Sequence, residues 1–154
     1  MLHYDKKHLF TFGGEHKRFT AGTERVVVNF RGVRILLEVC YDLRFPVWSR
    51  NLGDYDMILY VASWPTPRVD AWSALLRARA IENQCYVAGV NRMGTDPACE
   101  YSGGSAIIDP YGKTIAECPW SRESAVSADI DMEALQAFRK KFPVLDDADP
   151  FTLI

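Results

Sequence analysis

The sequence contains no apolar stretch long enough to cross a lipid bilayer, which takes about 20 residues. Its longest apolar run, residues 33–40, is interrupted by Arg34 and Glu38. Residues 1–8 are polar and lack the apolar core of a secretory signal. These absences predict a cytoplasmic protein with no membrane partner.

A marked excess of charge of one sign is also absent, because 18 basic and 20 acidic residues give a formal net charge of -2. This balance provides no electrostatic surface for nucleic acid. The four cysteines form no Cys-x-x-Cys pair, so the sequence lacks the pattern typical of a zinc or redox centre. We therefore expect no metal, no cofactor and no nucleic-acid partner.

The composition is that of one globular domain, with 154 residues of which 48% are hydrophobic and 25% charged. β-Branched runs mixed with helical periodicity predict an α/β fold with a mixed sheet. The expected strands are residues 26–30, 33–39, 57–62, 85–90, 105–108, 113–116 and 126–130, and the expected helices 46–52, 69–84 and 132–141. Residues 93–104 are expected to form a loop, and the strand at 33–39 to be buried on both faces.

Cys40 is the residue with the clearest chemical potential. It directly follows the strand at 33–39 and precedes a turn and the helix that Pro46 begins. Such an elbow places a side chain at the carboxyl end of a sheet, where α/β proteins build their sites. A thiolate there is a nucleophile if its pKa is lowered or a base removes its proton. The alternative is that Cys40 simply ends a core strand, since cysteine is commonly buried.

Five segments, in this order along nearly the whole chain, resemble motifs of the nitrilase superfamily of carbon–nitrogen hydrolases. They are YDKKHLF at 4–10, GEHKRFTAG at 14–22, CYDLRFP at 40–46, RARAIENQCYV at 77–87 and GGSAIIDPYG at 103–112. The sequence is most similar to the omega-amidase branch, which removes the distal amide of 2-oxoglutaramate-type acids. The resemblance implies a four-layer α-β-β-α sandwich, a small amide substrate and a homodimer or higher oligomer.

The same resemblance implies catalytic roles for three residues. Cys40 corresponds to the nucleophile, Lys6 to the lysine that stabilises the oxyanion, and Glu15 to the second glutamate that supports this lysine. Taken by themselves, Lys6 and Glu15 are ordinary surface charges. The neighbouring Lys7 competes with Lys6 for the assignment, which rests on the register of the motif.

Three further residues are expected to line the substrate site, namely Tyr41, Arg44 and Trp64. A guanidinium at position 44 could hold a substrate carboxylate in bidentate fashion. Trp64 follows the buried strand at 57–62 and reaches the same sheet end as Cys40 if the two strands are parallel neighbours. The alternatives are a scaffold role for Arg44, paired with Asp42, and ordinary indole packing for Trp64.

The sequence departs from the family at its N-terminal end. The family's first catalytic glutamate, its general base, lies upstream of the lysine motif, and only five residues precede Lys6. We therefore expect the C-terminal part of such an enzyme, beginning at an internal methionine. A step without its base loses on the order of 10²–10⁴ in rate, so we expect little activity from this chain alone.

Two alternatives follow from this departure. Glu38, two residues before Cys40 on the same strand face, is a candidate substitute base, although pairing with a basic residue is the more ordinary expectation. The chain could also be a non-catalytic remnant, or the partner-binding half of a split nitrilase-type protein.

Overall fold

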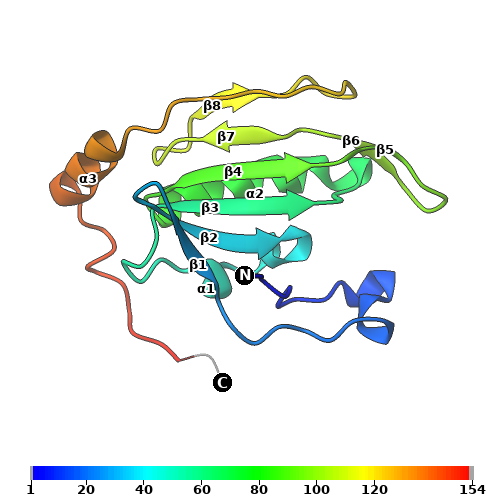
Figure 1. The fold of residues 1–154 in the computed structure, drawn as a ribbon, viewed down its shortest axis with the longest axis horizontal. Helices are drawn as coiled ribbons and strands as arrows, with labels where there is room; N and C mark the ends of the chain where they lie inside the picture. The colour runs from blue at the N-terminus through cyan, green and yellow to red at the C-terminus, as the bar shows by residue number, and fades with distance from the viewer. Residues whose placement is uncertain (1, 153–154) are drawn as a thin grey trace.

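The computed structural model describes residues 2–152, which form one mixed six-stranded sheet with helices packed around it (Figure 1). The strand order is β1-β2-β3-β4-β7-β8, in which β2, β3 and β4 are parallel to one another. The strands are β1 Val27–Phe30, β2 Val33–Val39, β3 Met57–Ala62, β4 Tyr86–Asn91, β7 Ala106–Ile108 and β8 Thr114–Glu117, and a separate hairpin pairs β5 Met93–Thr95 with β6 Glu100–Ser102. The helices are α1 Pro46–Ser49, α2 Val69–Glu82 and α3 Met132–Lys141, with short 3-10 turns η1 Thr11–Gly13, η2 Glu15–Lys17, η3 Cys40–Arg44 and η4 Thr66–Arg68.

Helix α2 covers one face of the sheet and forms the core with it (Figure 1). Trp72 and Leu76 are buried against the sheet, where they lie over Gly89 of β4. A methyl group at position 89 would lie 2.6 Å from Leu76 Cδ1, so only glycine lets the helix approach this closely. The central strands are therefore fixed relative to α2.

The opposite sheet face is less covered than the sequence predicts. In β2, Leu36 and Glu38 are buried while Leu37 and Val39 between them are only partly so. On the same face, Val61 of β3 is 48% exposed and Val90 of β4 is 50% exposed. The prediction that residues 33–39 are buried on both faces is therefore wrong for the described residues, which contain one large sheet rather than two stacked sheets.

Most predicted elements are present, and three predictions need correction. Residues 126–130 form no strand, because no neighbouring backbone within residues 2–152 pairs with them. The expected loop at 93–104 contains the hairpin β5–β6, whose short polar strands show little periodicity. The helix expected at 46–52 ends at Ser49, and Gly53 with φ of 77° lies in the turn that follows.

Glu38 is buried in the core and forms no ion pair with a basic residue within residues 2–152, contrary to the expectation. Ser49 Oγ donates to Glu38 Oε2 at 2.9 Å, and the Tyr60 hydroxyl lies 3.1 Å from the same Ser49 Oγ. Glu38 Oε1 has no hydrogen-bond partner. Burial raises the pKa of Glu38 to about 7, although hydrogen bonds with Tyr60 and Ser49 act against it.

We expect this buried acid to make stability depend on pH. Because the folded-state pKa of Glu38 is raised from 4.5 to about 7, its contribution is fully present below pH 4.5 and lost as the pH rises through about 7. The loss amounts to about 3 kcal/mol. Urea unfolding across this range should show it. Glu38→Gln should flatten the profile, whereas the exposed control Glu117→Gln should leave it unchanged, and an unaltered profile in Glu38→Gln would contradict the assignment.

Candidate active site

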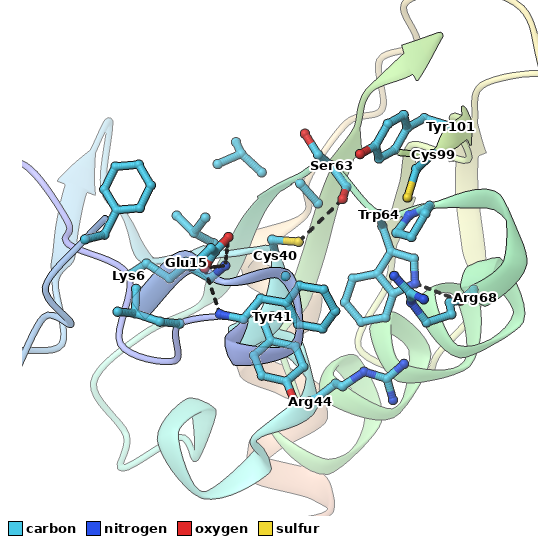
Figure 2. Close-up of a pocket in the computed structure, with 18 of the residues that line it drawn as sticks. Lys6, Glu15, Cys40, Tyr41, Arg44, Ser63, Trp64, Arg68, Cys99 and Tyr101 are labelled. Carbon is cyan, nitrogen blue, oxygen red and sulfur yellow. Dashed lines mark hydrogen bonds and ion pairs between the residues drawn. The ribbon is translucent and has the colours of Figure 1, made fainter. Parts of the chain in front are cut away.

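The parallel pairing of β2 with β3 brings the residues that follow the two strands to one sheet edge. A cavity of about 750 Å³ opens there, and all six predicted site residues line it (Figure 2). They are Lys6, Glu15, Cys40, Tyr41, Arg44 and Trp64. Figure 2 shows Lys6 and Glu15 on one side of the Cys40 sulfur and Trp64 on the other. The N-terminal segment and the sheet edge thus form two walls of one site.

Cys40 begins η3 directly after β2, with φ of 49° in the left-handed region that non-glycine residues rarely adopt. Strained backbone of this kind is typical of functional sites, where the surrounding structure holds it. Its Sγ lies 3.9 Å from the carbonyl oxygen of Ser63, to which the thiol donates. Burial raises the pKa of the Cys40 thiol, and Lys6 opposes this shift. The thiol therefore needs a proton acceptor or a stronger cation effect to become an effective nucleophile.

Lys6 and Glu15 form a tight ion pair beside this thiol. Lys6 Nζ donates to both carboxylate oxygens of Glu15, at 2.9 and 2.7 Å, and the backbone N–H of Phe10 donates to Glu15 Oε2 at 2.8 Å. Burial would raise the pKa of Glu15, but the hydrogen bonds from Lys6 and Phe10 outweigh it and lower that pKa. Lys7 points elsewhere, with its Nζ 5.1 Å from the ring centroid of Trp48. The geometry thus favours Lys6 over Lys7.

Asp42 joins the segment that carries Lys6 to the elbow that carries Cys40. Its fully buried carboxylate accepts hydrogen bonds from the Tyr4 hydroxyl at 2.9 Å and the His8 backbone N–H at 2.8 Å. The Val39 N–H donates to Oδ2 at 3.1 Å, and His8 Nδ1 lies 2.9 Å from Oδ1. Asp42 therefore does not pair with Arg44, and it fixes Lys6 relative to Cys40.

Aromatic side chains form much of the remaining wall. The Tyr41 ring meets Phe10 edge-on at 5.0 Å, and the Arg44 guanidinium lies 5.0 Å from the ring centroid of Trp64. Trp64 is only 3% exposed, and its indole Nε1 donates to the carbonyl of Arg68 at 2.7 Å. Trp64 therefore both packs in the core and bounds the cavity.

Several cavity residues escaped the sequence reasoning. Arg68 follows a Pro-rich loop at the start of α2, and Cys99 and Tyr101 come from the β5–β6 hairpin, which the sequence did not predict. Glu38 does not line the cavity, because the backbone turns at Cys40 and ends the strand alternation. Its candidacy as a substitute base is therefore wrong.

Two expected absences can be compared with the described residues. No cluster of three or more His, Cys, Asp or Glu side chains within residues 2–152 has the arrangement of a metal site. No helix in the same part of the chain is long and apolar enough to span a membrane. The cavity itself is lined by a thiol, a cation and a carboxylate, namely Cys40, Lys6 and Glu15.

The cavity thus brings together a half-buried thiol at a strand-to-helix elbow, a lysine and a glutamate, which are residue types that nucleophilic catalysis by cysteine can use. The model of the carbon-nitrogen hydrolase family matches residues 2–140. This chain belongs to that family.

Known relatives lie within the same family. The chain is 56% identical over 151 residues to omega-amidase YafV of Escherichia coli (strain K12), covering 97% of this chain and 59% of the relative. It is 42% identical over 146 residues to the 2-oxoglutaramate amidase of Bacillus subtilis (strain 168), covering 94% and 56%. The chain thus spans less than two thirds of the length of these curated relatives.

Solved structures confirm the nitrilase-type α/β fold. XC1258 from Xanthomonas campestris, a CN-hydrolase superfamily protein with an arsenic adduct in its active site, superposes with a TM-score of 0.94 at 48% identity, covering 98% of this chain and 60% of that chain. Nit3 of Saccharomyces cerevisiae, a nitrilase superfamily member, superposes with a TM-score of 0.80 at 26% identity, covering 90% and 51%. The described sheet and its helices are therefore part of this architecture.

We expect thiol reactivity to follow exposure to the cavity. Cys40 and Cys99 line it, whereas Cys85 and Cys118 are buried. Limited iodoacetamide labelling with peptide mapping should modify Cys40 first, Cys99 next, and the other two only after unfolding. Fast labelling of Cys85 or Cys118 while Cys40 stays inert in folded protein would refute the nucleophile assignment.

Proposed function

We propose that this chain carries the nucleophile of an enzyme that hydrolyses the amide of a short 2-oxo dicarboxylic acid monoamide and releases ammonia. The observation that carries this proposal is the convergence of Cys40, Lys6 and Glu15 in one cavity. The names of the relatives, omega-amidase and 2-oxoglutaramate amidase, support the substrate class.

The proposed reaction proceeds through a thioester. Cys40 Sγ attacks the amide carbon, and the Sγ–C bond forms while the C–N bond breaks. The thiol proton passes to the departing nitrogen, which leaves as ammonia. Lys6 Nζ stabilises the oxyanion of the tetrahedral intermediate, and Glu15 holds Lys6 in place through the 2.7 and 2.9 Å contacts. Water then cleaves the thioester to give the carboxylic acid and the free thiol.

Proton transfer is the step of this mechanism for which the described residues provide the least support. Among the described residues, the carboxylates that line the cavity are Asp5 and Glu15. Glu15 is engaged by Lys6, and the exposed Asp5 lies 3.5 Å from His3. General base catalysis contributes about 10²–10⁴ in rate. We therefore propose that the 154-residue chain alone reacts slowly. The alternative function, a non-catalytic binding half of a split protein, predicts that the amide substrate does not react with Cys40 at all.

A test should separate acylation from turnover. We expect the chain, incubated with 2-oxoglutaramate, to gain the mass of the substrate less ammonia on Cys40, and its steady-state ammonia release to remain far below the roughly 10 s⁻¹ typical of enzymes. The control Cys40→Ala should show neither the adduct nor the release. Absence of an adduct in the unaltered chain would favour the binding half, and rapid turnover would show that the described residues suffice for proton transfer.

Compartment and assembly belong to the same proposal. All four cysteines are free in the structure, which supports a reducing compartment such as the cytoplasm. The open sheet face, on which Val90 is half-exposed outside the cavity, supports association into a homodimer or higher oligomer. Sedimentation of the purified chain measures its oligomeric state directly.

A further inference from the structure

Two arginines line the cavity, and neither has an anionic partner within residues 2–152. Five arginines pair with carboxylates elsewhere in the described chain, namely Arg25, Arg34, Arg79, Arg92 and Arg139. The other described arginines without a carboxylate partner lie outside the cavity. Arg44 is exposed and lies against Trp64, whereas Arg68 is half-buried. A guanidinium held in an aromatic cavity without a counter-charge is available to an anionic ligand.

The position of Arg68 is fixed from both ends. Its backbone N–H donates to the Pro65 carbonyl at 3.0 Å, and its own carbonyl accepts the Trp64 indole N–H at 2.7 Å. Its guanidinium lies 5.6 Å from the ring centroid of Phe10, a cation–π contact across the cavity. Figure 2 shows Arg68 beside Trp64, on the opposite side of Cys40 from Lys6 and Glu15.

Phe10 connects this guanidinium to the reacting end of the site. The Phe10 N–H donates to Glu15 Oε2 at 2.8 Å, and Glu15 in turn holds Lys6. The cavity therefore has a charge-paired end beside the Cys40 thiol and an unpaired cation at the other end. This separation suits an elongated substrate with an amide at one end and an anion at the other.

We propose that Arg68 binds the substrate carboxylate remote from the reacting amide and thereby selects monoamides of dicarboxylic acids over neutral amides. The proposal rests on the function proposed above and assigns its specificity to a particular side chain. The planar guanidinium can donate two parallel hydrogen bonds to a carboxylate, which an amide cannot receive with the same charge complementarity. Hydrogen bonds to charged groups contribute enough for a loss of about 10- to 100-fold in affinity when one partner is removed.

The test measures ligand protection of Cys40 rather than turnover. Glutaramate and glutaramide have the same length and differ by one carboxylate. We expect glutaramate to slow iodoacetamide labelling of Cys40 at a concentration at least tenfold lower than glutaramide. Arg68→Gln should raise the half-protecting concentration of glutaramate by at least tenfold and leave that of glutaramide unchanged. Arg68→Lys, which keeps the charge but not the planar fork, should give an intermediate loss and guards against misfolding of the first variant.

Arg77→Gln is the matched control, because Arg77 lies at an exposed position of α2 outside the cavity. In this variant the half-protecting concentrations of both ligands should equal those of the unaltered chain. Equal protection by the two ligands, or equal loss in Arg77→Gln, would overturn the assignment of Arg68. The proposed function fails separately. If the carboxylate ligand protects Cys40 but never acylates it, Arg68 remains an anion-binding residue and the proposed amidase activity is refuted. If Cys40 is acylated equally in the unaltered chain and in Arg68→Gln, the amidase activity stands and the role of Arg68 is refuted.

Discussion

Replacement of Asp42 by asparagine is expected to detach the segment that carries Lys6 from the elbow that carries Cys40. Four groups converge on the Asp42 carboxylate, and it is fully buried. Asparagine keeps only one acceptor oxygen. Its NH₂ group takes the place of the second carboxylate oxygen and faces hydrogen-bond donors, which it cannot accept from. Each buried polar group left without a partner costs about 1–3 kcal/mol, so we expect a loss of about 3–5 kcal/mol in the free energy of unfolding.

Urea unfolding measures this loss, and the labelling rate of Cys40 measures its consequence for the site. We expect slower labelling, because a displaced Lys6 no longer lowers the pKa of the Cys40 thiol. Asp70→Asn, an exposed change in the first turn of α2, is the control for amide substitution. A stable Asp42→Asn variant with an unchanged labelling rate would mean that the segment is held by other contacts, such as the stacking of His8 on Phe45.

Much of the fold could be predicted because its strands carry strong local signals. Residues 57–62 form an apolar run and residues 33–39 one that only Arg34 and Glu38 interrupt, and they form β3 and β2 with the predicted bounds. The helix predicted at 132–141 is present as α3, and the side chain of Asp131 caps its start by accepting the Ala134 N–H at 2.8 Å. By contrast, residues 126–130 have a strand-like sequence but no partner, which no local signal reveals.

The site was predictable only where a motif carried it. The cluster of Lys6, Glu15 and Cys40 is visible in the resemblance to a family, but neither spacing nor composition shows that these residues meet. Arg68 has no such signal, because an arginine at the start of a helix is usually solvated. Its relevance depends on the cavity, which forms only when the N-terminal segment docks on the sheet edge. For Glu38 the local pattern misled, since β2 ends at Val39 and the positive φ of Cys40 breaks the alternation that would have placed both side chains on one face.

Replacement of Lys6 by methionine is expected to move the reactivity of Cys40 to higher pH. Burial raises the pKa of the Cys40 thiol, and Lys6 is the largest opposing influence. A nearby cation lowers the pKa of an acidic group by about 1–3 units, so its removal should reduce the thiolate fraction at neutral pH by about 10- to 1,000-fold. The rates of labelling in the two proteins should converge at alkaline pH, because both thiols are then ionised.

The neighbouring lysine provides the matched control. Lys7 lies over Trp48 and away from the thiol, so Lys7→Met should leave the pH profile of Cys40 labelling unchanged.

The same Lys6→Met variant also tests Glu15, whose pKa is lowered in the folded state. The stability that this pairing contributes is present above the ordinary pKa of a glutamate and is lost as the pH falls through the lowered value. Lys6→Met should therefore weaken the acid limb of the stability profile as well. A shift in Cys40 reactivity without any change in that limb would show that Lys6 acts on the thiol independently of Glu15, and no shift in either would place the cation elsewhere.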